Sequence, residues 1–196
     1  MQDTQRNDEF TAVIRGKLGE KRFYHSMCVA QAARELAGRY GADAEKAYTA
    51  GILHDVMKEA DAEEQLQTIA LAGIILTDVE RANRKLWHAV AGYAYCRDTL
   101  HVTDPGILDA IRYHTTGRAG MSLLEKCVYI ADFISADRDY PGVDQIRACA
   151  QRGLREVMLE GMKFTIAELA QSGQPIHPDS VGAYNQIIIS DSEGNE

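Results

Sequence analysis

Apolar residues recur every three or four positions along most of the chain, which is the spacing of one face of a helix. The alternation typical of strands is scarce, and there are only four prolines. This spacing predicts helices at about 8–18, 21–40, 44–57, within 62–84, 86–100, 105–114, 123–134, 143–172 and 179–189. The expected fold class is therefore an all-α helical bundle.

Several helix ends carry their own signals. Gly41 is expected to stop one helix, and Asp43 is expected to cap the start of the next. Asp104 and Pro105, in "TDPG", predict another helix start. The stretch "SLLE" at 122–125 has the spacing of a capping box.

The chain divides into one main domain and two short extensions. We expect an N-terminal extension with a short helix at 1–19, a single domain at 20–190 and a disordered tail at 191–196. A length of 196 residues with 45% apolar side chains is enough for one substantial core.

Composition excludes several classes of function. No apolar run approaches the roughly 18 residues that cross a bilayer, and the polar, acidic N-terminus lacks the features of a signal peptide. We therefore expect a cytoplasmic protein without a membrane partner. The net charge of −8 argues against a broad nucleic-acid surface. The four cysteines form no CxxC pair and are expected to be reduced. The oligomeric state is left open.

Two aspartates lie in runs that should be buried. Asp55 lies in "GILHDVMK" at 51–58, and Asp132 lies in "CVYIADFI". A buried carboxylate is costly unless it is paired, caps a helix or binds a metal. Histidines at helical positions complete a set of imidazole and carboxylate groups: His25, His54, Asp55, His88, His114 and Asp132. Such a set indicates a site for iron, manganese or zinc rather than a thiolate site. Each histidine alone, however, is more often a core residue. The ligands come from separate helices, so spacing does not show that they converge.

The order His…His-Asp…His…His…Asp resembles the HD-domain metal-dependent phosphohydrolases. "HDVMK", residues 113–147 and the motif "PIHPDSVGAYN" at 175–185 resemble the YqeK family in particular, over roughly residues 20–188. The resemblance implies an HD-domain helical bundle. It also implies a symmetrical bis(5′-nucleosyl)-tetraphosphatase that uses iron to cleave diadenosine tetraphosphate, a small-molecule nucleotide, into two ADP. Manganese, cobalt or zinc are expected substitutes for the iron.

The resemblance also assigns roles to residues. The implied metal ligands are His25, His54, Asp55 and Asp132. If a second metal binds, Asp55 bridges to it and His88 and His114 hold it; with one metal, those two histidines contact phosphate. Hydroxide generated at the metal is expected to attack an inner phosphorus, with His54, Asp55 and Lys58 as the catalytic residues.

The remaining implied substrate contacts each have a plainer alternative. Lys58 and Arg138 would bind phosphate, but Lys58 could be a solvated lysine and Arg138 a partner of Asp137 or Asp139. Thr115 would offer a hydroxyl, or simply form a turn. The C-terminal motif adds His177, Pro178, Asp179 and Ser180, which could instead be an ordinary helix start.

Two departures from the family pattern stand near the expected pocket. The family usually has Glu-Pro where this chain has Ser135-Ala136, and Arg where it has Tyr184. Both could alter nucleotide preference. The alternative functions are an HD-domain nucleotidase or dNTP phosphohydrolase, and a non-enzymatic metal or nucleotide sensor. The metal ligands alone do not separate these enzymes.

Overall fold

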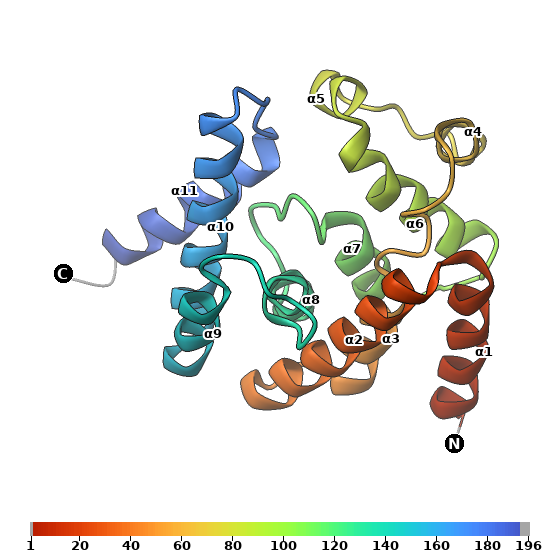
Figure 1. Ribbon diagram of the computed structural model, residues 1–196, viewed down its shortest axis with the longest axis horizontal. Helices are drawn as coiled ribbons and strands as arrows, with labels where there is room; N and C mark the ends of the chain where they lie inside the picture. Colours follow the sequence, from red (N-terminus) through yellow and green to blue (C-terminus); the bar gives the residue numbers. More distant parts are fainter. Residues whose placement is uncertain (1, 193–196) are drawn as a thin grey trace.

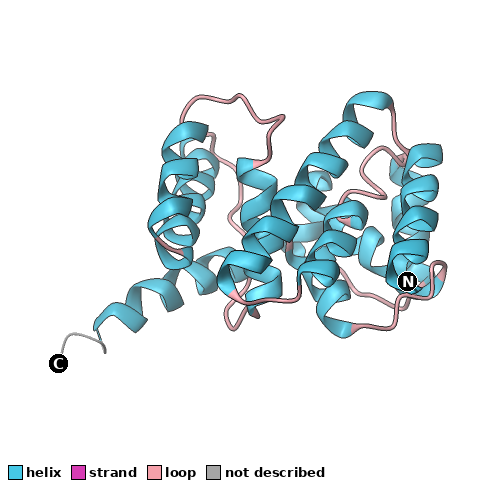
Figure 2. Cartoon of the chain, turned by 90° about the horizontal axis from the view of Figure 1, so that it is seen from below, coloured by secondary structure: helices cyan, strands magenta, loops and turns pink. Residues whose placement is uncertain are grey.

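The computed structural model describes residues 2–192, with side chains for residues 5–190. Over this range the chain forms eleven α-helices and one short 3-10 helix, with no strand (Figures 1 and 2). The helices are α1 (Gln2–Lys17), α2 (Glu20–Tyr40), α3 (Ala44–Leu53), α4 (Ala62–Leu71), α5 (Asp78–Ala82), η1 (Arg84–Leu86), α6 (Trp87–Asp98), α7 (Pro105–Tyr113), α8 (Leu123–Ile134), α9 (Val143–Arg152), α10 (Leu154–Gln171) and α11 (Pro178–Ser192). The all-α prediction is confirmed.

The centre of the bundle is the packing of α2 against α3 and α8, with α7 between α8 and α6. In Figure 1, α1 and α4–α6 lie on one side of this centre, and α9–α11 lie on the other. Both views place the two ends of the chain on opposite sides.

Helices α2 and α3 approach each other very closely at Gly51. A Cβ atom added there would lie 2.5 Å from the Cα of Ala30. Val29 and Ala33 of α2 and Ile52 of α3 are fully buried at this contact. The end of α3 is thereby held directly against α2.

The predicted helix signals are confirmed. Gly41 ends α2 in the left-handed conformation (φ 83°), and the Asp43 side chain caps α3 by accepting from two backbone N–H groups. Asp104 caps α7 with Pro105 in its first turn, and the Ser122–Glu125 capping box starts α8.

Other predicted boundaries are wrong. The first helix begins at Gln2 rather than near residue 8, and it packs Phe10 and Ile14 into the core. The helix expected at 143–172 is two helices, because Gly153 has extended backbone (φ 170°, ψ 160°) between α9 and α10. Glycine has the lowest helix propensity after proline, so a break there is inexpensive. Most of the tail expected to be disordered lies outside the described residues, and α11 continues through Ser192.

Within residues 2–192, no helix combines the length and the apolar character needed to cross a membrane.

Candidate metal centre

The His54-Asp55 pair lies at the end of α3, not inside a helix. The helix predicted to reach Met57 ends at Leu53. His54 Nδ1 donates to the carbonyl of Gly51 at 2.7 Å. In a longer helix that carbonyl would accept from the backbone N–H of Asp55. The histidine side chain therefore takes the place of a backbone donor at the end of α3.

His114 ends α7 in the same way. Its Nδ1 donates to the carbonyl of Ile111 at 2.8 Å. A carbonyl oxygen can only accept, so Nδ1 carries the proton in both His54 and His114. In the neutral form of each ring, Nε2 then offers its lone pair to a metal ion.

His25 comes from α2 and is oriented by a carboxylate. Its Nδ1 lies 2.8 Å from Oδ2 of Asp137, whose Oδ1 accepts from the Ser135 hydroxyl at 2.8 Å. Its Nε2 lies 3.0 Å from Oδ1 of Asp132 on α8. Asp137 was missed by the sequence analysis except as a partner for Arg138. The only signal available was its place in the loop directly after α8.

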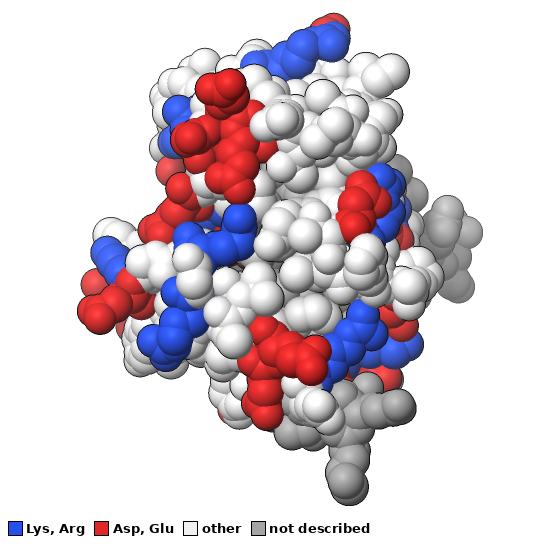
Figure 3. All heavy atoms as spheres, turned by 90° about the vertical axis from the view of Figure 1, so that its right-hand side faces the viewer, with Lys and Arg blue, Asp and Glu red and all other residues white. Residues whose placement is uncertain are grey.

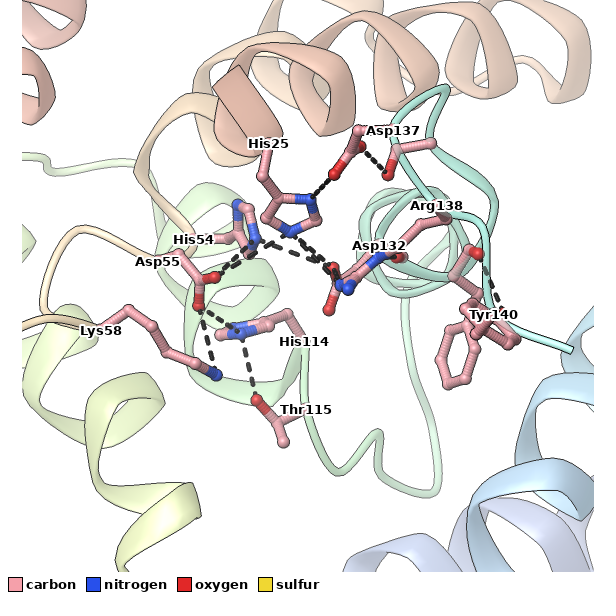
Figure 4. A network of polar contacts seen from close by, with 12 residues as sticks. His25, His54, Asp55, Lys58, His114, Thr115, Asp132, Asp137, Arg138 and Tyr140 are labelled. Carbon is pink, nitrogen blue, oxygen red and sulfur yellow. Dashed lines mark hydrogen bonds and ion pairs between the residues drawn. The ribbon is translucent and has the colours of Figure 1, made fainter. Parts of the chain in front are cut away.

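The imidazoles and carboxylates singled out in the sequence meet at one place. Figure 4 shows five of them there: His25, His54, Asp55, His114 and Asp132. Asp55 is central: its Oδ2 lies 3.5 Å from His54 Nε2, and its Oδ1 lies 3.2 Å from His88 Nε2 and 3.5 Å from His114 Nε2. Groups of three ligand atoms, each within 4.8 Å of one another, are formed by His25, His54 and Asp55; by His54, His114 and Asp132; and by Asp55, His88 and His114. We call these six residues the His/Asp cluster.

The His/Asp cluster fits a metal ion. His54 Nε2 and Asp55 Oδ1 are buried and have no hydrogen-bond partner among the described residues. Leaving two such atoms unsatisfied is costly, and a cation between them would satisfy both. The side chain of Asp132 is 22% exposed, so the His/Asp cluster is open to solvent on that side.

Protonation in the cluster also suits metal binding. Burial alone would raise the pKa of Asp55, but His54, His114 and His88 hold it well below its ordinary value. Burial would also raise the pKa of Asp132, but it is outweighed by interactions that lower the pKa, of which the hydrogen bond with His25 is the largest. Burial lowers the pKa of His88 to about 4. Near neutral pH the carboxylates are therefore ionised and His88 is neutral, which are the forms that bind metals.

Three cations surround the cluster. Arg22 Nη1 donates to Asp55 Oδ2 at 2.9 Å, and Lys58 Nζ lies 3.8 Å from Asp55 Oδ1. Arg138 pairs with Asp132 and lies 3.3 Å from His25 Nε2, rather than pairing with Asp137 or Asp139. Arg22 was missed in the sequence, although it lies one turn before His25 on α2.

The other expected substrate contacts divide into two groups. Thr115 Oγ1 lies 3.0 Å from His114 Nε2 and so borders the cluster. The segment 177–180 lies outside it. There Ser180 Oγ donates to the Thr116 carbonyl at 2.8 Å, and the Nδ1 of buried His177 accepts from the Asp179 N–H at 3.1 Å. With Pro178 as its first residue, α11 is thereby fixed to the loop after His114.

This helical fold and buried His/Asp cluster define a metal-binding HD protein, and comparisons with known proteins agree. The HD domain family model matches residues 22–137. The chain is 40% identical over 181 residues to the symmetrical bis(5′-nucleosyl)-tetraphosphatase of Bacillus subtilis (strain 168), covering 92% of this chain and 97% of that protein. It is 37% identical over 177 residues to the enzyme of the same name from Halalkalibacterium halodurans, covering 90% of this chain and 94% of that protein.

A solved structure is also similar. The crystal structure of a predicted HD superfamily hydrolase involved in NAD metabolism, from Clostridium acetobutylicum, superimposes with a TM-score of 0.89 at 37% identity. The match covers 93% of this chain and 97% of that one. The chain belongs to the HD-domain family and, within it, to the symmetrical bis(5′-nucleosyl)-tetraphosphatases of the YqeK type.

Proposed function

We propose that the protein is a metal-dependent hydrolase that cleaves diadenosine tetraphosphate symmetrically into two ADP. The observation that carries the proposal is the convergence of the His/Asp cluster, on a chain similar over nearly its full length to enzymes of that name. Lysine and arginine side chains form separate groups beside acidic ones on the face shown in Figure 3. This surface suits a small anionic substrate better than an extended nucleic acid.

The proposed ligand roles follow the two sides of Asp55. His25, His54, Asp55 and Asp132 would hold one metal ion. On the other side, His88 and His114 face Asp55 Oδ1, where a second ion could bind. A bound ion supplies Lewis-acid chemistry, because it lowers the pKa of water and neutralises phosphate charge.

The protein's own side chains would position the polyphosphate. Lys58 and Arg138 border the cluster from opposite ends and would bind phosphate oxygens, and Thr115 would donate its hydroxyl. We propose that the 177–180 segment contacts the nucleotide, since it packs on the loop that follows Thr115. ADP is a stable leaving group, so positioning and charge stabilisation would supply most of the rate.

We propose iron as the native metal. Imidazole and carboxylate ligands suit iron, and they also bind manganese, cobalt and zinc. Elemental analysis of protein purified without oxygen tests this directly. Iron at one or two equivalents per chain would support the proposal, and zinc or manganese alone would contradict it.

Product analysis tests the reaction. The iron-loaded protein is incubated anaerobically with diadenosine tetraphosphate, and the nucleotides are separated by chromatography. The proposal predicts ADP as the sole product and loss of activity after chelation. AMP with ATP would overturn the symmetrical cut. Nucleotide binding without turnover, with iron, manganese, cobalt or zinc, would favour the sensor.

A further inference from the structure

A basic cavity adjoins the His88 end of the His/Asp cluster. Its volume is about 530 Å³, which is in the range of small-molecule sites. It is lined by Lys58, Gln65, Arg84, Lys85, His88 and Thr115. We call it the basic cavity. Three of these residues, Gln65, Arg84 and Lys85, lie outside the His/Asp cluster and its proposed phosphate contacts.

Two of its cations come from the short helix η1. Arg84 and Lys85 lie directly before α6, and His88 lies in the first turn of α6. The rim of the basic cavity and part of the cluster are thus built by one continuous stretch. The Asn83 side chain accepts from the Lys85 N–H and fixes the start of η1.

The side chains of Arg84 and Lys85 do not stabilise the fold through ion pairs or hydrogen bonds within the described residues. Within the described part of the chain, the side chains of Arg84 and Lys85 are exposed and make no ion pair or hydrogen bond. Arg81, three residues earlier, is paired with Asp78. Two unpaired cations beside Lys58 form a local positive site in a chain of net charge −8.

Gln65 gives the basic cavity a second kind of partner. It is only 4% exposed, and its Nε2 donates to the carbonyl of Met57 at 2.8 Å. Its Oε1 is buried and has no partner among the described residues. A ligand that fills the cavity could therefore offer both phosphate oxygens to the cations and an N–H or O–H donor to Gln65. A nucleotide has both.

The opposite end of the cluster has a cavity of its own. That cavity has a volume of about 290 Å³ and is lined by Asp132, Phe133, Arg138, Tyr140, Phe164 and Glu168. Figure 4 shows Lys58 and Thr115 at one end of the cluster, and Arg138 and Tyr140 at the other. A substrate with two identical halves, cut at its middle, requires space on both sides of the reacting phosphorus.

We propose that the basic cavity binds one ADP half of the dinucleotide, with Arg84 and Lys85 on its phosphates and Gln65 Oε1 as an acceptor. This inference rests on the proposed function, because that function fixes the cut between two ADP halves. Arg84 and Lys85 then act as substrate-binding residues and not as metal ligands. Removing them weakens nucleotide binding and leaves metal binding intact.

The test uses the double variant Arg84→Ala/Lys85→Ala of the full chain, loaded with iron. Arg81→Ala is the control, because it removes one positive charge from a neighbouring position that does not line the cavity. Calorimetric titration with ADP measures affinity and the number of ADP molecules bound per chain. A second measurement gives KM for diadenosine tetraphosphate, and elemental analysis gives the iron content.

The expected result is that the double variant binds ADP at this cavity at least tenfold more weakly, or binds one fewer ADP per chain, with unchanged iron. Its KM for the dinucleotide rises by about the same factor, and Arg81→Ala behaves as wild type. The inference is overturned if the double variant binds as many ADP molecules as wild type with the same affinity. If wild type does not hydrolyse the dinucleotide but its ADP binding still depends on Arg84 and Lys85, the proposed function fails and the nucleotide site stands.

Discussion

At the scale of single residues, Asp137 is the least expected part of the site. Its carboxylate fixes His25 through Nδ1 and is itself held by the Ser135 hydroxyl. Ser135 is one of the positions at which we expect this chain to depart from the YqeK pattern. Ser135 therefore contributes, through Asp137, to the orientation of a proposed metal ligand.

Asp137→Asn tests this positioning role. Asparagine keeps the size of the side chain but removes the charge that makes the His25 ring a stronger ligand. We expect metal affinity to fall by about 10- to 100-fold, measured by competition with a chromophoric chelator. Asp139→Asn is the control, because Asp139 is exposed and has the same chemistry two residues away. Equal affinity in both variants would remove Asp137 from the site.

The sequence could identify the cluster residues but not their partners. Asp55 and Asp132 were visible because carboxylates are rare in apolar runs. Arg22 and Asp137 lie in polar stretches, where a charged residue is ordinary. Their roles depend on contacts between helices that are distant in sequence, so no local pattern reveals them.

At the scale of helices, the site depends on the close packing of α2 on α3. His25 lies on α2 and His54 ends α3, so the separation of these two helices sets the distance between two ligands. At Gly51 an added Cβ would lie 2.5 Å from Cα and 2.8 Å from N of Ala30. Both are main-chain atoms, so only movement of a whole helix could relieve the contact.

Gly51→Ala is expected to destabilise the protein and to weaken metal binding. Overpacking of this kind costs about 1–3 kcal/mol in the free energy of unfolding, measured by urea denaturation. Gly38→Ala is the matched control: Gly38 lies on the exposed face of α2, with no atom within 4 Å of the added Cβ. That control should gain about 0.5–1 kcal/mol. A Gly51→Ala variant as stable as wild type would contradict the close-packing account.

Helix identity was predictable from spacing, whereas some helix ends were not. Capping residues such as Asp43 and Ser122 act locally, and their predictions are confirmed. The end of α3 depends on a histidine side chain that displaces a backbone donor, which spacing cannot show. The break at Gly153 was missed because apolar residues continue on both sides of it.

At the scale of the whole molecule, buried Glu80 connects three distant parts of the chain. It pairs with Arg112 of α7, and His177 Nε2 lies 3.9 Å from its Oε1. It also completes the capping box of α5 with Thr77. Since α7 ends at His114, this ion pair helps hold one side of the His/Asp cluster in place.

Glu80→Gln tests this connection through pH. Burial raises the pKa of Glu80, but the Thr77 N–H and Arg112 outweigh it and lower the pKa below its ordinary value of 4.5. The charged form therefore stabilises the fold above pH 4.5, and this contribution is lost as pH falls through the lowered pKa. Glutamine can keep the capping box while removing the charge.

We expect Glu80→Gln to lose about 1–3 kcal/mol near pH 7, measured by urea denaturation. The difference from wild type should shrink as pH falls below 4.5. A loss of the same size at every pH would show that packing, and not the charge of Glu80, is responsible.

In the proposed reaction, water attacks an inner phosphorus of a symmetrical dinucleotide at the His/Asp cluster. Hydrolysis of diadenosine tetraphosphate in H₂¹⁸O, followed by mass spectrometry of the products, tests it most directly. We expect ADP as the sole product, with a single ¹⁸O on the terminal phosphate of one ADP in every two. Label in AMP or ATP would contradict it.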